Sequence, residues 1–237
     1  MLPEKNLTSA ARKAFAGLLL VGLVSGCSTS VTLEPPTIPV PLTDKIPVAI
    51  GLRMPANFHN FVHEEEVFGR EEWSIDLGGS NAKMFSQLFG FMFNDVIVLK
   101  GDEDPAAHNL DALIEPSIDA FEFSVPNQSK TDSFAVWIRY RIKVYDRAGT
   151  LVSNWPVSAY GKSQTASMSN SEALQRAAIL AMRDAAALMI MKMDDATQIG
   201  SLANSTAPVP SVAPAAPTTE EDDLQSTAVE GQNDESS

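Results

Sequence analysis

The sequence predicts an α+β domain in which a mostly antiparallel sheet carries two helices on one face. Residues 133–145 alternate apolar and polar side chains over the length of a long β-strand. Two other segments, 80–93 and 171–193, repeat apolar residues every three or four positions, as amphipathic helices do. Because several short strand-like segments lie between the helices, the expected order of elements is β-β-α-β-β-β-β-α.

The first half of this domain predicts two short strands, a helix and a third strand. Apolar residues alternate over 48–52 and again over 73–77, as half-buried strands require. The stretch 58–68 between them fits neither a helix nor a strand period. Ser80 is a candidate N-cap for the first helix, and residues 96–99 form a short apolar strand.

The second half predicts paired strands. Over residues 112–125 the apolar residues change from even to odd positions, which requires one inserted residue, so we expect a bulge near Ala120. Residues 146–150 supply a turn with a glycine for positive φ, and 151–160 return as the antiparallel partner. Pro156 removes one ladder donor, which places that partner at or near a sheet edge.

The final helix begins at a capping box. Ser169 and Glu172 have the spacing in which each side chain accepts a hydrogen bond from the other residue's backbone amide. The helix then runs to about residue 193. Its apolar stripe is rich in alanine, which allows close approach to a sheet or another helix.

The N-terminus has the pattern of a lipoprotein signal peptide. Three basic residues precede an apolar run, residues 14–24, that is too short to span a bilayer. The run ends in Val24-Ser25-Gly26-Cys27, which resembles a lipobox, and Cys27 is the only cysteine. We therefore expect residues 1–26 to be removed and Cys27 to be lipidated. With that thiol acylated, no disulfide can form.

Composition divides the rest of the chain into three parts. Residues 27–45 contain four prolines and no hydrophobic period, which predicts a semi-rigid tether. Residues 46–199 form the α+β periplasmic domain. Residues 200–237 have no Lys, Arg or aromatic residue and cannot offset their ordering entropy by apolar burial, so we expect a disordered acidic tail.

The net charge of −13 opposes nucleic-acid binding. Seven of the acidic residues lie in the tail, where the simplest interpretation is a self-repelling, solubilising segment. A cation or partner contact is the alternative for that segment. We expect the lipid on Cys27 to be the contact with the membrane. A serine at position 28, directly after the lipidated cysteine, resembles the signal that sorts lipoproteins to the outer membrane. Retention in the inner membrane is the alternative.

Several short stretches add a family resemblance. They are Ile50-Gly51-Leu52, residues 73–78, Ile114-Glu115-Pro116, residues 140–149 and Tyr160-Gly161. Together with the lipobox, the proline-rich segment and the order of elements, they make the chain similar to small outer-membrane lipoproteins of the YajG, LptE, PelC and CsgG-like kind. The resemblance implies a non-catalytic accessory protein in an envelope assembly or export system.

Two local patterns have a chemical and a structural interpretation. His59 and His63 are four residues apart, so on a helix they could share a zinc ion with a nearby glutamate, but a solvated polar segment is the better account of them. Gly78-Gly79-Ser80 could bind an anion on free amides, or serve only as a turn and cap. The sequence pairs no nucleophile with a base, so we expect no enzyme, no cofactor and no metal.

The long strand carries the candidate binding surface. Its outward positions are Trp137, Arg139, Arg141, Lys143 and Tyr145. Cations flanked by aromatic rings suit phosphates, anionic glycans or an acidic partner. The alternative is an ordinary solvated face whose cations pair with Glu122 and its neighbours.

Two functions therefore remain open. The first is a lipid-anchored scaffold in an outer-membrane complex, with an envelope protein complex or a homo-oligomer as partner. The second is a binding module for an anionic envelope lipid or glycan that uses the strand face.

Overall fold

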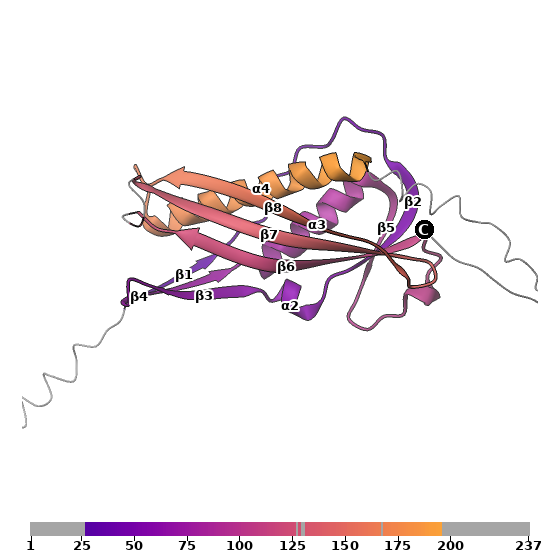
Figure 1. Ribbon diagram of the computed structural model, residues 1–237, viewed down its shortest axis with the longest axis horizontal. Coiled ribbons are helices and arrows are strands. Elements are labelled where there is room, and N and C mark those ends of the chain that lie inside the picture. The colour runs from indigo at the N-terminus through magenta and orange to yellow at the C-terminus, as the bar shows by residue number, and fades with distance from the viewer. Residues whose placement is uncertain (1–26, 127, 129–130, 167, 196–237) are drawn as a thin grey trace, which may run out of the picture. The chain divides into compact units, whose positions relative to one another are not determined.

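The computed structural model describes residues 27–126, 128, 131–166 and 168–195. They form two sheets with two long helices, and the α+β class predicted from the sequence is confirmed (Figure 1). The predicted signal peptide, residues 1–26, and the predicted tail, 200–237, lie outside the described residues.

The larger sheet has the strand order β5-β2-β6-β7-β8. The strands are β2 (Ile46–Arg53), β5 (Phe93–Leu99), β6 (Ala112–Ser124), β7 (Ser133–Asp146) and β8 (Leu151–Gln164). β6, β7 and β8 are antiparallel, but β2 is parallel to both β5 and β6. The sheet is thus mixed, but most of its paired residues are antiparallel, as the sequence predicted. The parallel part arises because the long connection from β2 to β5 returns in the same direction.

The paired strands match their sequence pattern. The register of β6 against β7 shifts between Ile118 and Ala120, which confirms the predicted bulge. Gly149 has φ 79° in the turn between β7 and β8. β8, which contains Pro156, is an edge strand as predicted. These features follow from local chemistry, so the sequence pattern was enough to predict them.

The smaller sheet has the order β1-β4-β3 and corrects the predicted tether. Its strands are β1 (Cys27–Thr32), β3 (Val62–Val67) and β4 (Glu71–Asp76). β1 pairs with β4 in parallel from its first residue, and Val31, Leu33 and Ile38 are buried in the main core. The prolines that suggested a tether follow the strand; Pro36 and Ile38 in this stretch are buried, whereas Val40 and Leu42 beyond them are exposed.

The helices are α2 (Ala56–His59), α3 (Gly78–Met92) and α4 (Asn170–Asp195), with a 3₁₀ turn, η2 (Pro105–Ala107). The segment left unassigned in the sequence forms α2 and β3. The capping box of α4 is present: Ser169 N donates to Glu172 Oε2 over 2.9 Å, and Glu172 N donates to Ser169 Oγ over 3.3 Å.

The start of α3 differs from the prediction that Ser80 caps it. Leu77 is the N-cap, and Ser80 lies inside the first turn, where its hydroxyl donates to the Leu77 carbonyl. The helix begins at Gly78, and this position requires glycine because a Cβ there would collide with the His59 carbonyl. The Gly78 amide donates to Asp76 Oδ1, so the cap comes from the end of β4.

Both long helices pack on the same face of the larger sheet, as predicted. Phe85 of α3 lies 5.4 Å from the Tyr140 ring of β7, and α4 runs along β7 and β8 (Figure 1). The smaller sheet covers part of the same face, with the Trp73 ring 5.7 Å from both Phe123 and Phe134. The opposite face is left exposed along β7 and β8.

Candidate functional site

β7 divides its side chains between the two faces of the larger sheet. Its even positions, from Phe134 to Val144, are buried as predicted. Its odd positions from Trp137 to Tyr145 lie on the opposite side, together with exposed positions of β6 and β8. We call this side the outer face. All five predicted binding residues lie on it.

The five residues do not form one basic stripe, because Arg141 is neutralised. Arg141 Nη2 lies 2.5 Å from Asp119 Oδ2, and Nη1 donates to Asn154 Oδ1 over 3.3 Å. The hydrogen bond to Asp119 and its negative charge raise the pKa of Arg141. Asp119 sits at the bulge, where strand alternation does not predict the direction of a side chain. The ion pairing expected of a solvated face is therefore present here, with Asp119 in place of Glu122.

Tyr145 belongs to a separate environment near the β7–β8 turn. It packs against a second apolar cluster, formed by Leu99, Leu110 and Leu113. Burial and the adjoining Glu115 carboxylate raise the pKa of Tyr145. Glu115 in turn pairs with Arg53 Nη1 at 3.0 Å. Lys143, between Tyr145 and Arg141, is half-buried and makes no ion pair within the described residues.

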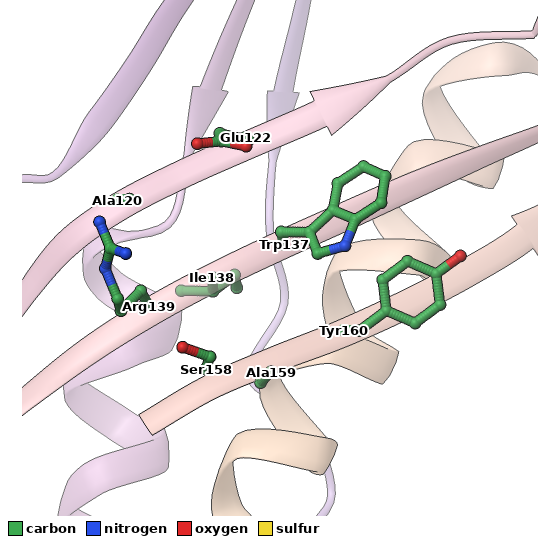
Figure 2. A pocket seen from close by; sticks show the side chains of 8 residues that line it. All are labelled: Ala120, Glu122, Trp137, Ile138, Arg139, Ser158, Ala159 and Tyr160. Atoms are coloured by element: carbon green, nitrogen blue, oxygen red, sulfur yellow. The ribbon is translucent and has the colours of Figure 1, made fainter. Parts of the chain in front are cut away.

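The other end of the outer face carries an exposed aromatic pair. Trp137 and Tyr160 are opposite each other on β7 and β8, their ring centroids are 5.1 Å apart, and they are 44% and 43% exposed (Figure 2). Arg139, one pleat away, makes no ion pair in the described part of the chain. Together with Glu122 and Ser158 these side chains line a hollow of about 480 Å³.

Tyr160 was not among the predicted site residues. The predicted hairpin contained the signal, because residue 160 lies at the end of the segment expected to pair with β7. Its exact partner depends on a register shift between Val144 and Tyr145, which the sequence pattern did not reveal. The structure thus places Trp137, Arg139 and Tyr160 in one site and leaves Arg141 and Tyr145 outside it.

A second hollow of about 480 Å³ lies beside the β7–β8 turn. Its charged groups largely satisfy one another. Arg53 pairs with Glu115, and Arg147 Nη2 lies 2.5 Å from Asp111 Oδ1. The second oxygen of Asp111 accepts the Ala49 amide over 2.9 Å, which ties β2 to the loop before β6. The ion pairs of Arg53 and Arg147 thus join β2, β6 and the β7–β8 turn beside this hollow.

The structure separates the two histidines considered for zinc. His59 ends α2, whereas His63 lies in β3, so they do not share a helix face. His63 Nε2 is 2.9 Å from Glu65 Oε2, and its ring is 4.9 Å from that of Phe121. Across the described ranges, no group of three or more His, Cys, Asp or Glu is arranged to hold a metal ion.

The amides of Gly78-Gly79-Ser80 were the other candidate, for an anion. The Gly78 amide already faces the Asp76 carboxylate at 3.1 Å and the Phe61 carbonyl at 3.1 Å. An incoming anion would meet that carboxylate. The segment therefore works as a turn and helix start.

Cys27, the predicted lipidation site, is the first described residue and begins β1. Its backbone pairs with that of Glu71 on β4. No helix among the described residues is both long and apolar enough to cross a membrane.

These features define an α+β protein with a mixed five-stranded sheet, a second small sheet and an exposed aromatic and cationic patch. No family model matches the chain. No curated protein matches it either.

Solved structures show a distant resemblance to bacterial lipoproteins. A minor lipoprotein from Acinetobacter baumannii is 13% identical over 67% of this chain and 94% of that one, with a TM-score of 0.38. Lipoprotein GNA1162 from Neisseria meningitidis is 11% identical over 67% of this chain and 100% of that one, with a TM-score of 0.30. The hypothetical protein CT253 from Chlamydia trachomatis is 9% identical over 62% of this chain and 96% of that one, with a TM-score of 0.38.

Proposed function

We propose that this chain is a lipid-anchored, non-catalytic adaptor of a bacterial envelope complex, held by acyl chains on Cys27 at the periplasmic face of the outer membrane. The lipobox before Cys27 supports the anchor. Several acyl chains hold a protein durably, since each buried methylene contributes about 0.8 kcal/mol.

The observation that carries the adaptor function is the Trp137–Tyr160 pair beside Arg139. Aromatic rings and arginine are the residues that contribute most to protein interfaces, and here two rings are more than two-fifths exposed. Arg139 has no carboxylate partner within the described residues, so a partner's acidic group can pair with it. The partner we propose is therefore a protein surface that combines an apolar patch with a carboxylate.

An anionic glycan or lipid remains the second candidate, and one observation favours it. Arg139, Lys143 and Lys162 lie on the outer face without ion pairs in the described part of the chain. Because Arg141 is already paired with Asp119, this set differs from the predicted one, with Lys162 in place of Arg141. A phosphate-bearing ligand held by these three cations should weaken more steeply as salt rises than a protein contact that combines two aromatic rings with one ion pair.

The test is site-specific photo-crosslinking in cells that express the full-length chain. A benzophenone side chain at Tyr160 should give one adduct of discrete mass with an envelope protein. The matched control at Leu151, an exposed residue on the same strand, should give none. Adding Arg139→Glu should remove the adduct, and so should Cys27→Ser, which should also move the protein to the soluble fraction.

Three outcomes contradict the proposal. Equal labelling from positions 160 and 151 would remove the evidence for a patch. A crosslink to lipid or glycan in place of protein would favour the second candidate. Persistence of the Cys27→Ser chain in the membrane fraction at high salt would show that the anchor lies elsewhere.

A further inference from the structure

The turn between β3 and β4 lies in the same row of the small sheet as Cys27. Glu71 of β4 pairs with Cys27 of β1 on one side and with Val67 of β3 on the other. Adjacent strands are about 4.8 Å apart, so this row is only two strand spacings wide. Residues 68–70 connect β3 to β4 beyond that row. The turn therefore projects from the end of the sheet at which β1 begins.

Phe68 in this turn has an unfavourable backbone conformation. Its φ is 56°, the only positive φ at a non-glycine residue in the described part of the chain, and Gly69 follows with φ 65°. The Arg70 amide donates to the Val67 carbonyl over 3.3 Å. A type I′ turn requires positive φ at both of its central residues. Asn-Gly adopts this conformation at little cost, whereas a bulky residue such as Phe68 adopts it with strain.

Within the described residues, little packing of the Phe68 side chain offsets this strain. Phe68 is 58% exposed, more than Trp137 or Tyr160, and its ring stacks on none of the described aromatic residues. Strained backbone conformations cluster at functional positions, so a strained residue with little packing points to a function outside the fold. An exposed aromatic ring beside a membrane attachment point suggests what that purpose is.

The surroundings of the turn indicate the kind of contact it makes. Arg70 is exposed, but Glu66, Glu71 and Glu72 flank it in the chain, so the hairpin end is not basic. A hollow of about 250 Å³ beside Phe68 is lined by polar residues, Asp132, Thr165 and Asn170 among them, and by the apolar Trp73, Val125, Pro126 and Phe134. The hairpin end therefore carries net negative charge, which anionic headgroups repel, so the contact must come from the ring.

We propose that residues 68–70 form a second membrane contact, in which the Phe68 ring enters the headgroup region of the bilayer that holds Cys27. This inference rests on the proposed lipidation of Cys27. Aromatic rings are favoured at the membrane interface, where they bury an apolar surface at the level of the headgroups. Acyl chains alone retain the protein but leave it free to tilt. A second contact in the same row fixes the orientation of the small sheet against the membrane.

The experiment places an environment-sensitive nitrobenzoxadiazole label at position 68 of the full-length lipidated protein through Phe68→Cys. The protein is reconstituted in vesicles of phosphatidylethanolamine with a minority of phosphatidylglycerol. We expect blue-shifted, brighter emission than in detergent-free buffer, and quenching by lipids that carry a spin label near the headgroup. Raising the salt concentration should not reverse the effect, because the contact is apolar.

Leu151→Cys supplies the matched control. Leu151 is also an exposed apolar residue, but it follows the turn at the other end of β7, opposite Tyr145. Its label should remain in water and escape the quencher. If positions 68 and 151 give the same emission while mass spectrometry shows acyl chains on Cys27, the second contact is wrong and the anchor stands. If Cys27 carries no acyl chain, the proposed anchor and this inference both fail.

A stability measurement separates a membrane role from a structural one. Phe68→Asn replaces the strained aromatic residue by one that suits a type I′ turn, so the melting temperature of the variant in solution should equal or exceed that of the native chain. A clear drop in melting temperature would show that Phe68 stabilises the folded domain, and the membrane contact would lose its main argument.

Discussion

At the scale of single residues, the core contains one polar pair that organises the contact between α3 and β7. The Tyr140 hydroxyl, fully buried, donates to Asn81 Oδ1 over 2.7 Å. Burial raises the pKa of Tyr140 well above its ordinary value. The Asn81 amide nitrogen is buried and has no hydrogen-bond partner among the described residues, so the hydroxyl satisfies only half of that side chain.

Removing the Tyr140 hydroxyl should therefore lower the free energy of unfolding by an amount that depends on Asn81 as well. Tyr140→Phe leaves Asn81 Oδ1 unsatisfied, and we expect a loss of about 1–3 kcal/mol in the free energy of unfolding. In a chain that already carries Tyr140→Phe, Asn81→Ala should cost less than it does in the native chain, because the interaction is already gone. Urea unfolding of the double-mutant cycle measures this coupling, and strictly additive losses would contradict it.

Tyr160→Phe is the control, since Tyr160 is exposed and its hydroxyl contributes no buried hydrogen bond. A change within about 0.5 kcal/mol is expected there. The raised pKa of Tyr140 gives a second check. Above about pH 10 the unfolded chain gains from ionising this phenol while the folded chain does not, so stability falls as pH rises, and Tyr140→Phe should remove that share of the loss.

At the scale of elements, α4 packs closely against β8 because residue 161 of the strand is a glycine. A Cβ at Gly161 would collide with the Ala177 carbonyl oxygen and the Ala181 nitrogen, both in the backbone of α4. The alanine stripe predicted for this helix is buried, and it brings the helix backbone onto the strand. Asp184 and Lys192 of the same helix then bind the backbone of β8, at Tyr160 N and Pro156 O.

Gly161→Ala should push α4 away from the sheet. We expect a loss of about 1–3 kcal/mol, the usual range for overpacking, or more because both close atoms are backbone. Gly90→Ala is the same chemical change, but its expected effect on the free energy of unfolding has the opposite sign. Gly90 lies inside α3 with open space around it, so alanine there should stabilise the fold by about 0.5–1 kcal/mol. Thermal unfolding compares the two, and equal shifts would contradict the close packing of α4.

At the scale of the whole molecule, the structure moves the start of the folded domain to the proposed lipid attachment point. β1 begins at Cys27, and the following segment buries Leu33 and Ile38. No long tether therefore separates the domain from Cys27. If Cys27 carries the proposed lipid, the protein meets only partners that lie close to the bilayer surface.

Truncation tests this arrangement. A chain that begins at Ile46 loses β1 and the buried side chains of Val31, Leu33 and Ile38, each worth about 1.5–3 kcal/mol on burial. Since whole domains are stable by about 5–15 kcal/mol, we expect partial or complete unfolding. A chain that begins at Ser28 should melt close to the unlipidated full-length chain. Equal melting temperatures for both truncations would restore the tether.

The sequence by itself determined whatever depends on neighbours along the chain. Residues 133–145 fixed the long strand and its buried face, because side chains alternate strictly in a strand. The parity change near Ala120 revealed the bulge, and Ser169 with Glu172 revealed the start of α4. The same alternation assigned Trp137 and Arg139 to the outer face.

Only the tertiary structure decided what depends on residues far apart in the chain. The parallel pairing of β1 with β4 joins residues more than forty positions apart and cannot be read from a local period. The same holds for the partner of Arg141, which the bulge places at Asp119, and for Tyr160 beside Trp137, which needs the register of β8. Local periods determine which face a side chain occupies, but register and strand order determine which side chains meet.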